Sequence, residues 1–508
     1  MRRQKILMIV CAVLLLVLIC AYFFVISPYI AKNTPEKDDE TPQLEQGESL
    51  GALNRIFMFD AIAADKISKI TVENSDDSYV FVKNSKGDLV IEGHEEIPVE
   101  VEAVALLKNV TGNTLTTKRV WSNCTDEKLD EYGLLEPQAT WTVESTDGKT
   151  FTAYVGDALL TGGGYYVMME GRRTVYTMSN DIKETVLAPA EKYVQAVVCA
   201  GIQQDDFYTV DKFTMYKNGE KMFRIRLVDK DQQNNPDALA ENILDYPTAY
   251  YPDSSLYYEV VYQYMGYVAD SCYSIDITDE ERAEIGMDDP AHVITFTYNE
   301  TDYEVYFSSK NEDGTYYSES SLFPGVIGIC NEKDLKYLEY DLIDWLDPYV
   351  YQQYITNISH LSVEGDGVSA EFDLSHSLDD KGQETVLSVE YGGKKFDTEN
   401  VENFRQYYKG ILALSIVDYY KDDEYCTKTE EEMQALMADE DNAMMTVRYK
   451  TRDGEESVLR FYRYSTRHCV VTVNGVGEFY LSCDLVDKVL NDTVKVINGE
   501  EVIANAKY

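Results

Sequence analysis

The sequence has 508 residues, 44% of them hydrophobic and 27% charged, with a formal net charge of −45. A chain of this length is too long for one hydrophobic core, so about two to four domains are expected. The acidic excess excludes nucleic acid and anionic lipid head groups as partners of the folded part, because like charges repel. The acids are scattered and form no calcium-binding loop, so they indicate solubility rather than a cation site.

The N-terminal segment differs from the rest of the chain in composition. Residues 1–5 read MRRQK, and Ile6–Ile26 contains no charged residue. A helix of that length spans about 30 Å, the thickness of the hydrocarbon core of a bilayer. Positive residues precede it and acidic residues follow it, which predicts a cytoplasmic N-terminus and an extracytoplasmic remainder. A cleaved signal peptide is the alternative, but the apolar run is long and ends in aromatic rather than small residues.

Residues 1–30 are therefore predicted to form a cytoplasmic stub and a single-pass transmembrane anchor in the cell membrane, with residues 6–26 in the lipid bilayer. Residues 31–54 contain prolines, many acids and few apolar residues. This composition predicts an acidic, disordered stalk.

Three similar stretches then open three similar regions of sequence. They read ISKITVE from Ile67, VDKFTMY from Val210 and ISHLSVE from Ile358. In each stretch the apolar residues at positions four and six share a face at the period of a strand. The same series of elements follows each stretch, so we predict three repeated modules at residues 55–200, 201–355 and 356–508.

An amphipathic helix is predicted after the opening strands of each module. The first begins near Pro98 and turns Val101 inward, and Asp253 and Asp397 are placed to cap the second and third.

A short acidic helix follows in each module, reading TDEKLDEYGL, TDEERAEIGM and TEEEMQALMA. Acids crowd its first turn, where they suit the helix dipole. In the first two modules Gly133 and Gly286 stand where a left-handed C-cap is wanted, and Pro137 and Pro290 prevent the helix from continuing.

Strand hairpins and a closing helix complete each module. Turns are predicted at Asp147-Gly148 and Asp453-Gly454, and the closing helices are expected in DIKETVL, EKDLKYLEYDLIDWL and DLVDKVL. The predicted fold is therefore α+β: one N-terminal transmembrane helix followed by three repeated α+β modules with mostly antiparallel sheets.

This pattern resembles the DUF4340 family of bacterial membrane-anchored proteins. The resemblance rests on the N-terminal anchor, ISKITVE, YGLLEPQATWTV, the DGKTFTAYVGD hairpin and YYVMMEGRRTVYTMSNDI, and covers most of residues 55–195. Members of the family are often associated with ABC-type export systems, including those related to gliding-motility auxiliary proteins. The resemblance therefore implies a membrane protein partner of the ABC permease type. It supplies no catalytic or ligand residues.

The sequence predicts no catalytic, cofactor or metal site. The five histidines have no partner at metal-ligand spacing, and the Gly162-Gly163-Gly164 run lacks the lysine and helix start of a phosphate loop. Paired acids for glycoside chemistry could be chosen almost anywhere among 90 Asp and Glu, so such a choice carries no weight.

Four cysteines recur at equivalent places in the second and third modules. Cys272 and Cys426 each precede the short acidic helix, and Cys330 and Cys483 each stand at the start of the closing helix. Disulfides Cys272–Cys330 and Cys426–Cys483 are one interpretation of this spacing. Buried free thiols are the other, and the sequence leaves both open.

Tyrosine is in excess, with 41 in the chain, and is densest between Asp245 and Tyr273. This region includes part of an insertion, about residues 229–253, that the other modules lack. Tyrosine favours interfaces because it has an apolar ring and a polar tip, so a docking surface is predicted at Tyr246, Tyr250, Tyr251 and Tyr257. Tyrosines half-buried on a helix and its covering loop are the alternative.

The sequence therefore predicts a non-enzymatic extracytoplasmic accessory subunit of a membrane transport complex. A free-standing cell-surface protein that binds wall polymer or another protein is the alternative. An extracytoplasmic enzyme would need a cleft with convergent polar groups, for which the sequence offers no motif.

Overall fold

The computed structural model describes residues 43–51, 56–112, 117–228, 241–247, 250–378 and 384–504. The predicted anchor at Ile6–Ile26 and most of the insertion at about residues 229–253 lie outside these ranges. Among the residues that are described, no helix is both long and apolar enough to cross a membrane.

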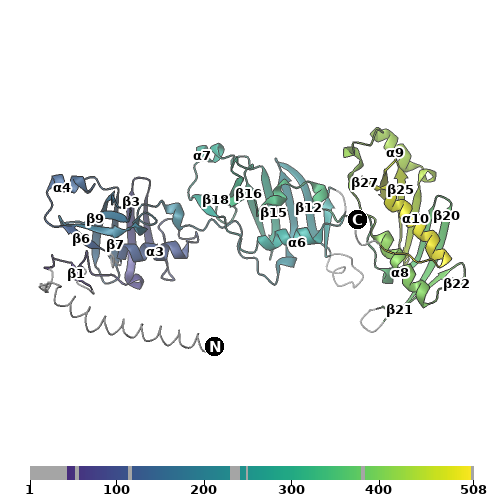
Figure 1. Cartoon of the computed structure of the whole chain (residues 1–508), viewed down its shortest axis with the longest axis horizontal. Coiled ribbons are helices and arrows are strands. Elements are labelled where there is room, and N and C mark those ends of the chain that lie inside the picture. The colour runs from purple at the N-terminus through teal and green to yellow at the C-terminus, as the bar shows by residue number, and fades with distance from the viewer. Residues whose placement is uncertain are drawn as a thin grey trace, which may run out of the picture. The chain divides into compact units, whose positions relative to one another are not determined.

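Three large sheets of one strand order make up the fold (Figure 1). The first is ordered β5-β4-β3-β7-β8-β9-β10-β6, the second β13-β12-β11-β15-β16-β17-β18-β14 and the third β22-β21-β20-β19-β24-β25-β26-β27-β23. In the first two sheets the first strand pairs with the fifth at the centre, and the fourth strand in chain order crosses to the far edge beside the last. The third sheet has an additional strand, so that β19 pairs with β24 at the centre and β23 crosses to the far edge beside β27. Every strand pair within the described ranges is antiparallel, so the predicted α+β class with antiparallel sheets is confirmed.

The strand bounds follow. The first sheet contains β3 (Ile67–Asn74), β4 (Ser78–Lys83), β5 (Leu89–Ile91), β6 (Lys118–Trp121), β7 (Ala139–Ser145), β8 (Thr150–Ala158), β9 (Gly164–Met169) and β10 (Val175–Ser179). The second contains β11 (Asp211–Lys217), β12 (Glu220–Leu227), β13 (Asn242–Tyr246), β14 (Ser271–Ser274), β15 (His292–Tyr298), β16 (Thr301–Phe307), β17 (Thr315–Ser320) and β18 (Ile327–Asn331). The third contains β19 (Ile358–Gly365), β20 (Val368–Leu378), β21 (Glu384–Tyr391), β22 (Lys394–Lys395), β23 (Asp418–Tyr419), β24 (Met445–Thr451), β25 (Glu456–Arg463), β26 (His468–Val473) and β27 (Phe479–Ser482).

The described α-helices are amphipathic helices, short acidic helices and one long helix at the end of the third module. The amphipathic helices are α3 (Val101–Gly112), α6 (Ser254–Gln263) and α8 (Thr398–Leu412). The short acidic helices are α4 (Asp126–Glu131), α7 (Asp279–Glu284) and α9 (Glu430–Ala438). The long helix is α10 (Cys483–Asn498), which closes the third module.

Each sheet buries one face beneath its amphipathic helix. Alternate residues of the central strand β7 are buried, including Trp141, and the helix α3 contacts β3 and β7. In the third sheet α8 contacts β21, and α10 contacts β19 and β20 (Figure 1). Alternation of buried and half-exposed positions along a strand is typical of an antiparallel sheet with one covered face. The prediction for Val101 was wrong, because its side chain is 72% exposed at the start of α3.

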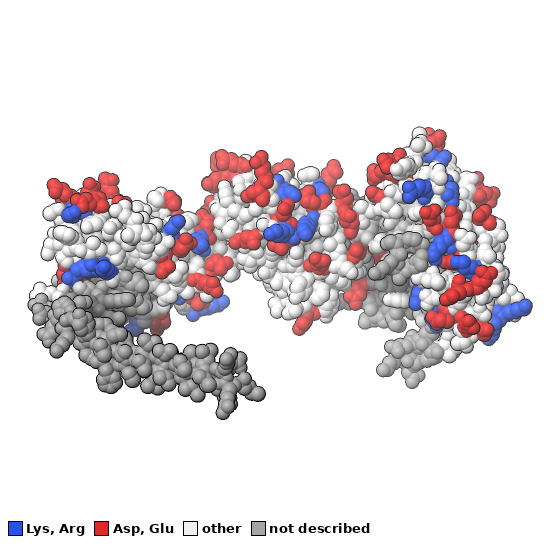
Figure 2. Space-filling view, in the orientation of Figure 1, with Lys and Arg blue, Asp and Glu red and all other residues white. Residues whose placement is uncertain are grey.

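The structure confirms the three short acidic helices that the sequence predicts. Thr125, Thr278 and Thr429 each accept a backbone hydrogen bond as the N-cap. Gly133 and Gly286 follow the first two helices with φ of 66° and 69°, the left-handed conformation that suits a C-cap. Acidic side chains gather over α4 and α7 (Figure 2).

Only the third of the predicted closing helices is an α-helix. Ser482 caps the N-terminus of α10 and Gly499 ends it with φ of 73°. In the first module the corresponding residues form a 3-10 turn, Asn180–Ile182, and Pro189 soon follows, which disfavours helix continuation. In the second, Asp341 caps a new 3-10 turn at Leu342–Trp345, so the predicted helix divides into short turns.

The end of the predicted stalk is folded rather than solvated. Residues Ser49–Leu50 form β1, which pairs with β2 (Ile56–Phe57). The carboxylate of Glu48 is fully buried and forms an ion pair with Arg119, and it accepts a hydrogen bond from Tyr176 Oη at 2.7 Å. This buried ion pair fastens residues 43–51 to β6 and β10 of the first sheet.

The chain divides into two compact units, the first with one of the large sheets and the second with the other two. One unit comprises residues up to His94 together with Val101–Pro189, and the other comprises Glu95–Glu100 together with Ala190–Tyr508. The predicted module boundaries near residues 200 and 355 remain predictions.

Candidate functional site

The four tyrosines of the predicted docking surface do not share one environment. Tyr257 is 1% exposed and packs its ring edge-on against Phe213, 5.7 Å away, so it belongs to the core beneath α6. Burial raises the pKa of its hydroxyl above the usual range. The prediction that Tyr257 lies on a docking surface is therefore wrong, because α6 turns this residue toward the sheet.

The other three tyrosines lie at or near the surface but make different contacts. Tyr246, 39% exposed, ends β13 and places its ring 4.7 Å from Lys221 Nζ. Tyr250 donates a hydrogen bond to the carbonyl of Tyr349 at 3.1 Å and packs on Phe479. Tyr251 is half-buried, and its carbonyl oxygen accepts a hydrogen bond from the amide of Asp347 at 2.9 Å. These contacts make Tyr250 and Tyr251 structural ties within the second compact unit.

The four predicted disulfide cysteines are free thiols in the structure. Cys272 directs its thiol to the carbonyl of Ser274 at 3.4 Å, and Cys330 lies 3.3 Å from the hydroxyl of Ser318. The thiol of Cys426 points toward the carbonyl of Lys428 at 3.9 Å, while Cys483 is buried at the start of α10. Neither predicted disulfide is formed in the structure, although Cys272 and Cys330 lie on the paired strands β14 and β18, with Cys272 opposite Gly328.

A buried polar cluster holds the loop between β23 and α9 in the third sheet. The carboxylate oxygen Oδ2 of Asp423 accepts a hydrogen bond from Tyr464 Oη at 2.5 Å and lies 2.7 Å from Nδ1 of His468. Its Oδ1 accepts from the amide of Tyr425 at 3.1 Å. The side chain of Asp423 is only 2% exposed. All the bonds to this carboxylate come from donors, as a buried anion requires.

The cluster shifts the pKa values of Asp423 and Tyr464. Burial acts to raise the pKa of Asp423, but the hydrogen bonds from Tyr464, His468 and the Tyr425 amide outweigh it, and the pKa is lowered. Burial and the hydrogen bond to Asp423 raise the pKa of Tyr464 far above its usual value. The cluster therefore holds a charged carboxylate and a neutral phenol. The ring of His468 is also covered by Tyr480, at a centroid distance of 4.8 Å.

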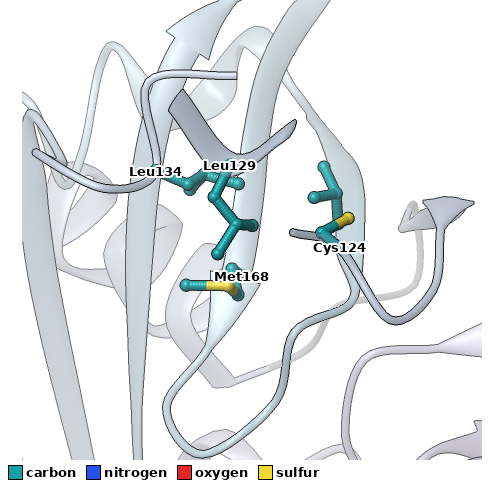
Figure 3. Packing of buried hydrophobic residues seen from close by; sticks show 5 residues of the cluster. Cys124, Leu129, Leu134 and Met168 are labelled. Carbon is teal, nitrogen blue, oxygen red and sulfur yellow. The ribbon is translucent and has the colours of Figure 1, made fainter. Parts of the chain in front are cut away.

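We use the word corner for the place in each sheet where the short acidic helix packs against the last strands. This corner is built differently in the first sheet. There the residues around α4 are apolar: Cys124, Leu129, Leu134 and Met168 pack together beside Val175 (Figure 3). Arg173 ties the corner from outside, donating to the carbonyl of Cys124 at 2.6 Å. The third sheet also has a buried cluster at this corner, and it adds the polar contacts of Asp423 to it; the members of the cluster are Tyr420, Met433, Tyr462, Tyr464 and Val470.

The second sheet uses an ion pair at its corner. Arg282 of α7 donates to Glu319 at 2.9 Å, and Glu319 also accepts from the amide of Gly325 at 2.8 Å. In the part of the chain that the structure describes, the corner of the third sheet differs from the other two because a histidine contacts a buried carboxylate there.

A cavity of 470 Å³ adjoins the polar corner of the third sheet. Its walls come from β23 and the turn after it, from α9 and from the turn between β26 and β27; the lining residues are Tyr419, Tyr420, Lys421, Glu430, Gln434, Met437, Ala438, Gly475, Val476, Gly477 and Glu478. A second, mostly apolar cavity of 160 Å³ shares Val476 and also contains Tyr250. Asp423 lies two residues after Lys421, so the polar cluster positions one wall of the larger cavity.

This corner is the candidate functional site, and its chemistry favours binding. The cavity combines aromatic rings, a methionine and both signs of charge, which suits an extended peptide segment better than a reacting centre. Across the described ranges, no three His, Cys, Asp or Glu side chains are grouped as metal ligands.

Sequence reasoning missed Asp423, Tyr464 and His468. Asp423 and His468 are 45 residues apart in the chain, so no motif spacing connects them. A comparison of the modules does not reveal the cluster either, because the first and third sheets both have an apolar cluster at this corner.

The fold defines a class of α+β proteins built from repeated antiparallel sheets. Within that class, the family model of a domain of unknown function, DUF4340, matches residues 90–251, so the chain is a DUF4340 domain-containing protein. The match begins in β5 and ends just before α6, and therefore takes in strands of both the first and second sheets. No curated protein and no solved structure matches the chain.

Proposed function

We propose that this protein is a non-enzymatic, extracytoplasmic accessory subunit of an ABC-type membrane transport or export complex, held in the cell membrane by residues 6–26. Three sheets of one strand order support this proposal, since they form a repeated scaffold with a distinct binding corner. Residues 55–200, 201–355 and 356–508 are the three repeats of that scaffold in this proposal. The resemblance to membrane-anchored partners of export systems points in the same direction.

The proposed contact with the membrane partner is the third-sheet corner. Val476 is 67% exposed and lines both cavities, and Lys421 also lines the larger one. An exposed apolar side chain beside an aromatic cavity is typical of a site that anchors a partner's side chain. The occupant is an extended segment of the permease that carries an apolar anchor.

Affinity purification of the tagged full-length protein from gently solubilised native membranes tests this function. We expect a permease or its ATPase at near-stoichiometric yield. Val476→Asp should reduce that yield at least about tenfold, because it places a charge in an apolar contact. Val386→Asp is the matched control, since Val386 is 59% exposed on β21. Recovery of the protein without any membrane partner would overturn the proposal.

A specific groove favours the second candidate function, a free-standing surface protein that binds wall polymer. The groove of 540 Å³ runs along α8 and contains Tyr349 and Tyr354, which are 44% and 50% exposed, with Gln352 and Arg405 beside them. Exposed tyrosines with amide and guanidinium donors suit the apolar faces and hydroxyls of sugars. In this case Tyr354→Ala should abolish sedimentation of the protein with purified wall material. Tyr208→Ala, at a tyrosine 48% exposed in the second module, should not change it.

A further inference from the structure

The groove of 540 Å³ along α8 has a wall that is fixed before any ligand arrives. Residues 347–355 form this wall, and the carbonyl of Gln353 accepts a hydrogen bond from Tyr408 Oη of α8 at 2.7 Å. The side chains of Tyr349 and Tyr354 also line the groove and are 44% and 50% exposed. A ligand that binds to a fixed wall pays little for ordering it.

Two cations one helical turn apart line the other side of the groove. Arg405 and Lys409 belong to α8, and residues four apart share one face of a helix. Arg405 Nε lies 4.0 Å from a carboxylate oxygen of Glu402, whose side chain is 66% exposed, so this pair is weak. Within the described ranges no ion pair involves Lys409, which is exposed. The groove therefore contains an ammonium without a counter-charge.

Among the described residues, the lining contains one carboxylate, that of Asp347. Its Oδ1 accepts a hydrogen bond from the amide of Tyr349 at 2.9 Å. Burial raises the pKa of Asp347, and the charge of Asp253 acts in the same direction. The lining thus combines two cations with a single acid that is already hydrogen-bonded to the wall.

Four other cavities of the described residues have the opposite balance of charge. Asp and Glu outnumber Lys and Arg in the lining of each, and the cavity beside Gly499 contains three glutamates and no cation. The whole chain has a formal net charge of −45. Its field repels anions, but charges farther away than the Debye length of about 8 Å are screened at physiological salt. The cations of this groove therefore favour an anionic ligand by direct contact.

We propose that the groove along α8 binds an acidic saccharide. The guanidinium of Arg405 matches the geometry of a carboxylate or phosphate group, and the ammonium of Lys409 adds a point charge. Tyr349 and Tyr354 offer ring faces to the apolar faces of sugar rings, and the side-chain amide of Gln353 can bind hydroxyl groups. The inference rests on the second candidate function, the binding of wall polymer, and specifies that this polymer carries anionic groups.

Calorimetric titration of the full-length protein at low salt tests the charge of the ligand. The probes are tetragalacturonate, its neutral methyl ester and an oligomer of glycerol phosphate. We expect at least one of the two anions to bind about tenfold or more tightly than the ester. Replacing both cations, in Arg405→Gln with Lys409→Gln, should weaken that binding at least about tenfold. Lys394→Gln with Lys395→Gln is the matched control, because it removes two exposed cations from β22, and it should change the affinity less than about twofold.

The comparison of the anions with the ester uses the wild-type protein, so it does not depend on the folding of a variant. Equal affinity for all three probes would overturn the inference and leave wall binding intact. Equal losses of affinity in the two double variants would also overturn it. If the protein sediments with wall material but binds none of the probes, the inference alone fails. If it does not sediment with wall material, the second candidate function itself is wrong.

Discussion

Oδ2 of Asp423 lies 2.7 Å from Nδ1 of His468, and the same oxygen accepts the hydroxyl of Tyr464. The contact joins the loop before α9 to the first residue of β26. Because the carboxylate is buried, its hydrogen bonds are needed to keep it charged.

Replacing this carboxylate should destabilise the third sheet. Asp423→Ala leaves the buried hydroxyl of Tyr464 without its acceptor, and we expect a loss of about 2 kcal/mol in the free energy of unfolding. Urea denaturation measures it. Asp126→Ala is the control, because its side chain is 77% exposed in its ion pair with Arg173, and it should cost less than about 1 kcal/mol. Equal effects of the two variants would contradict the importance of the buried cluster.

The ion pair of Arg282 with Glu319 should make stability depend on pH in the acid range. Burial acts to raise the pKa of Glu319, but hydrogen bonds from Arg282 and the Gly325 amide lower it more strongly. A lowered pKa in the folded state gives stability that is present above the unfolded value of about 4.3 and is lost as the pH falls through the folded value. We therefore expect the difference in urea midpoint between wild type and Glu319→Gln to be full at pH 6 and to shrink below about pH 4.

Glu332→Gln provides the comparison for that experiment. Glu332 pairs with Lys310 at 3.0 Å, but both side chains are about half exposed, at 51% and 44%. This variant should change the midpoint little at neutral pH. If the difference in urea midpoint between the wild type and Glu319→Gln stays constant down to pH 3, the ion pair does not make stability depend on pH.

Removing the charge of Glu48 should release the segment 43–51 from the first sheet. Glu48→Gln weakens a buried pair with Arg119, so amides of residues 43–51 should exchange with deuterium at least about tenfold faster. Hydrogen-exchange mass spectrometry detects this, and peptides from β26 and β27 should be unchanged. An unchanged rate at residues 43–51 would show that other contacts hold the segment.

The buried position of Tyr257 predicts a large effect on stability. Tyr257→Ala removes a ring packed on Phe213 beneath α6 and should cost about 3–5 kcal/mol by urea denaturation. Tyr246→Ala, at a ring 39% exposed, should cost less than about 1 kcal/mol. Similar losses for the two would contradict the assignment of Tyr257 to the core.

Local signals in the sequence predicted the local elements well. Thr125 and Gly133 delimit α4 because capping depends on a few neighbouring residues, and Asp147-Gly148 forms its hairpin turn for the same reason. Contacts across the sheet left no such signal. Tyr257 was placed on a surface because a tyrosine-rich run does not reveal which side of α6 faces the sheet.

Pairing between distant segments also explains what was missed at the candidate site. Asp423 meets His468 only after β27 has paired with both β26 and β23, so the cluster is a product of topology rather than of spacing. The cysteines show the same limit, because equivalent places in two modules predicted disulfides that the structure does not form.

The crossing of the fourth strand to the far edge has a consequence for synthesis. In the second sheet β14 pairs only with β18, and it leaves the ribosome before β15, β16 and β17. It therefore has no partner until the last strand of its sheet has been made, and closing so long a loop is slow. A nascent chain that stops before Ile327 has an unpaired edge strand, which is a target for quality-control proteases and for aggregation.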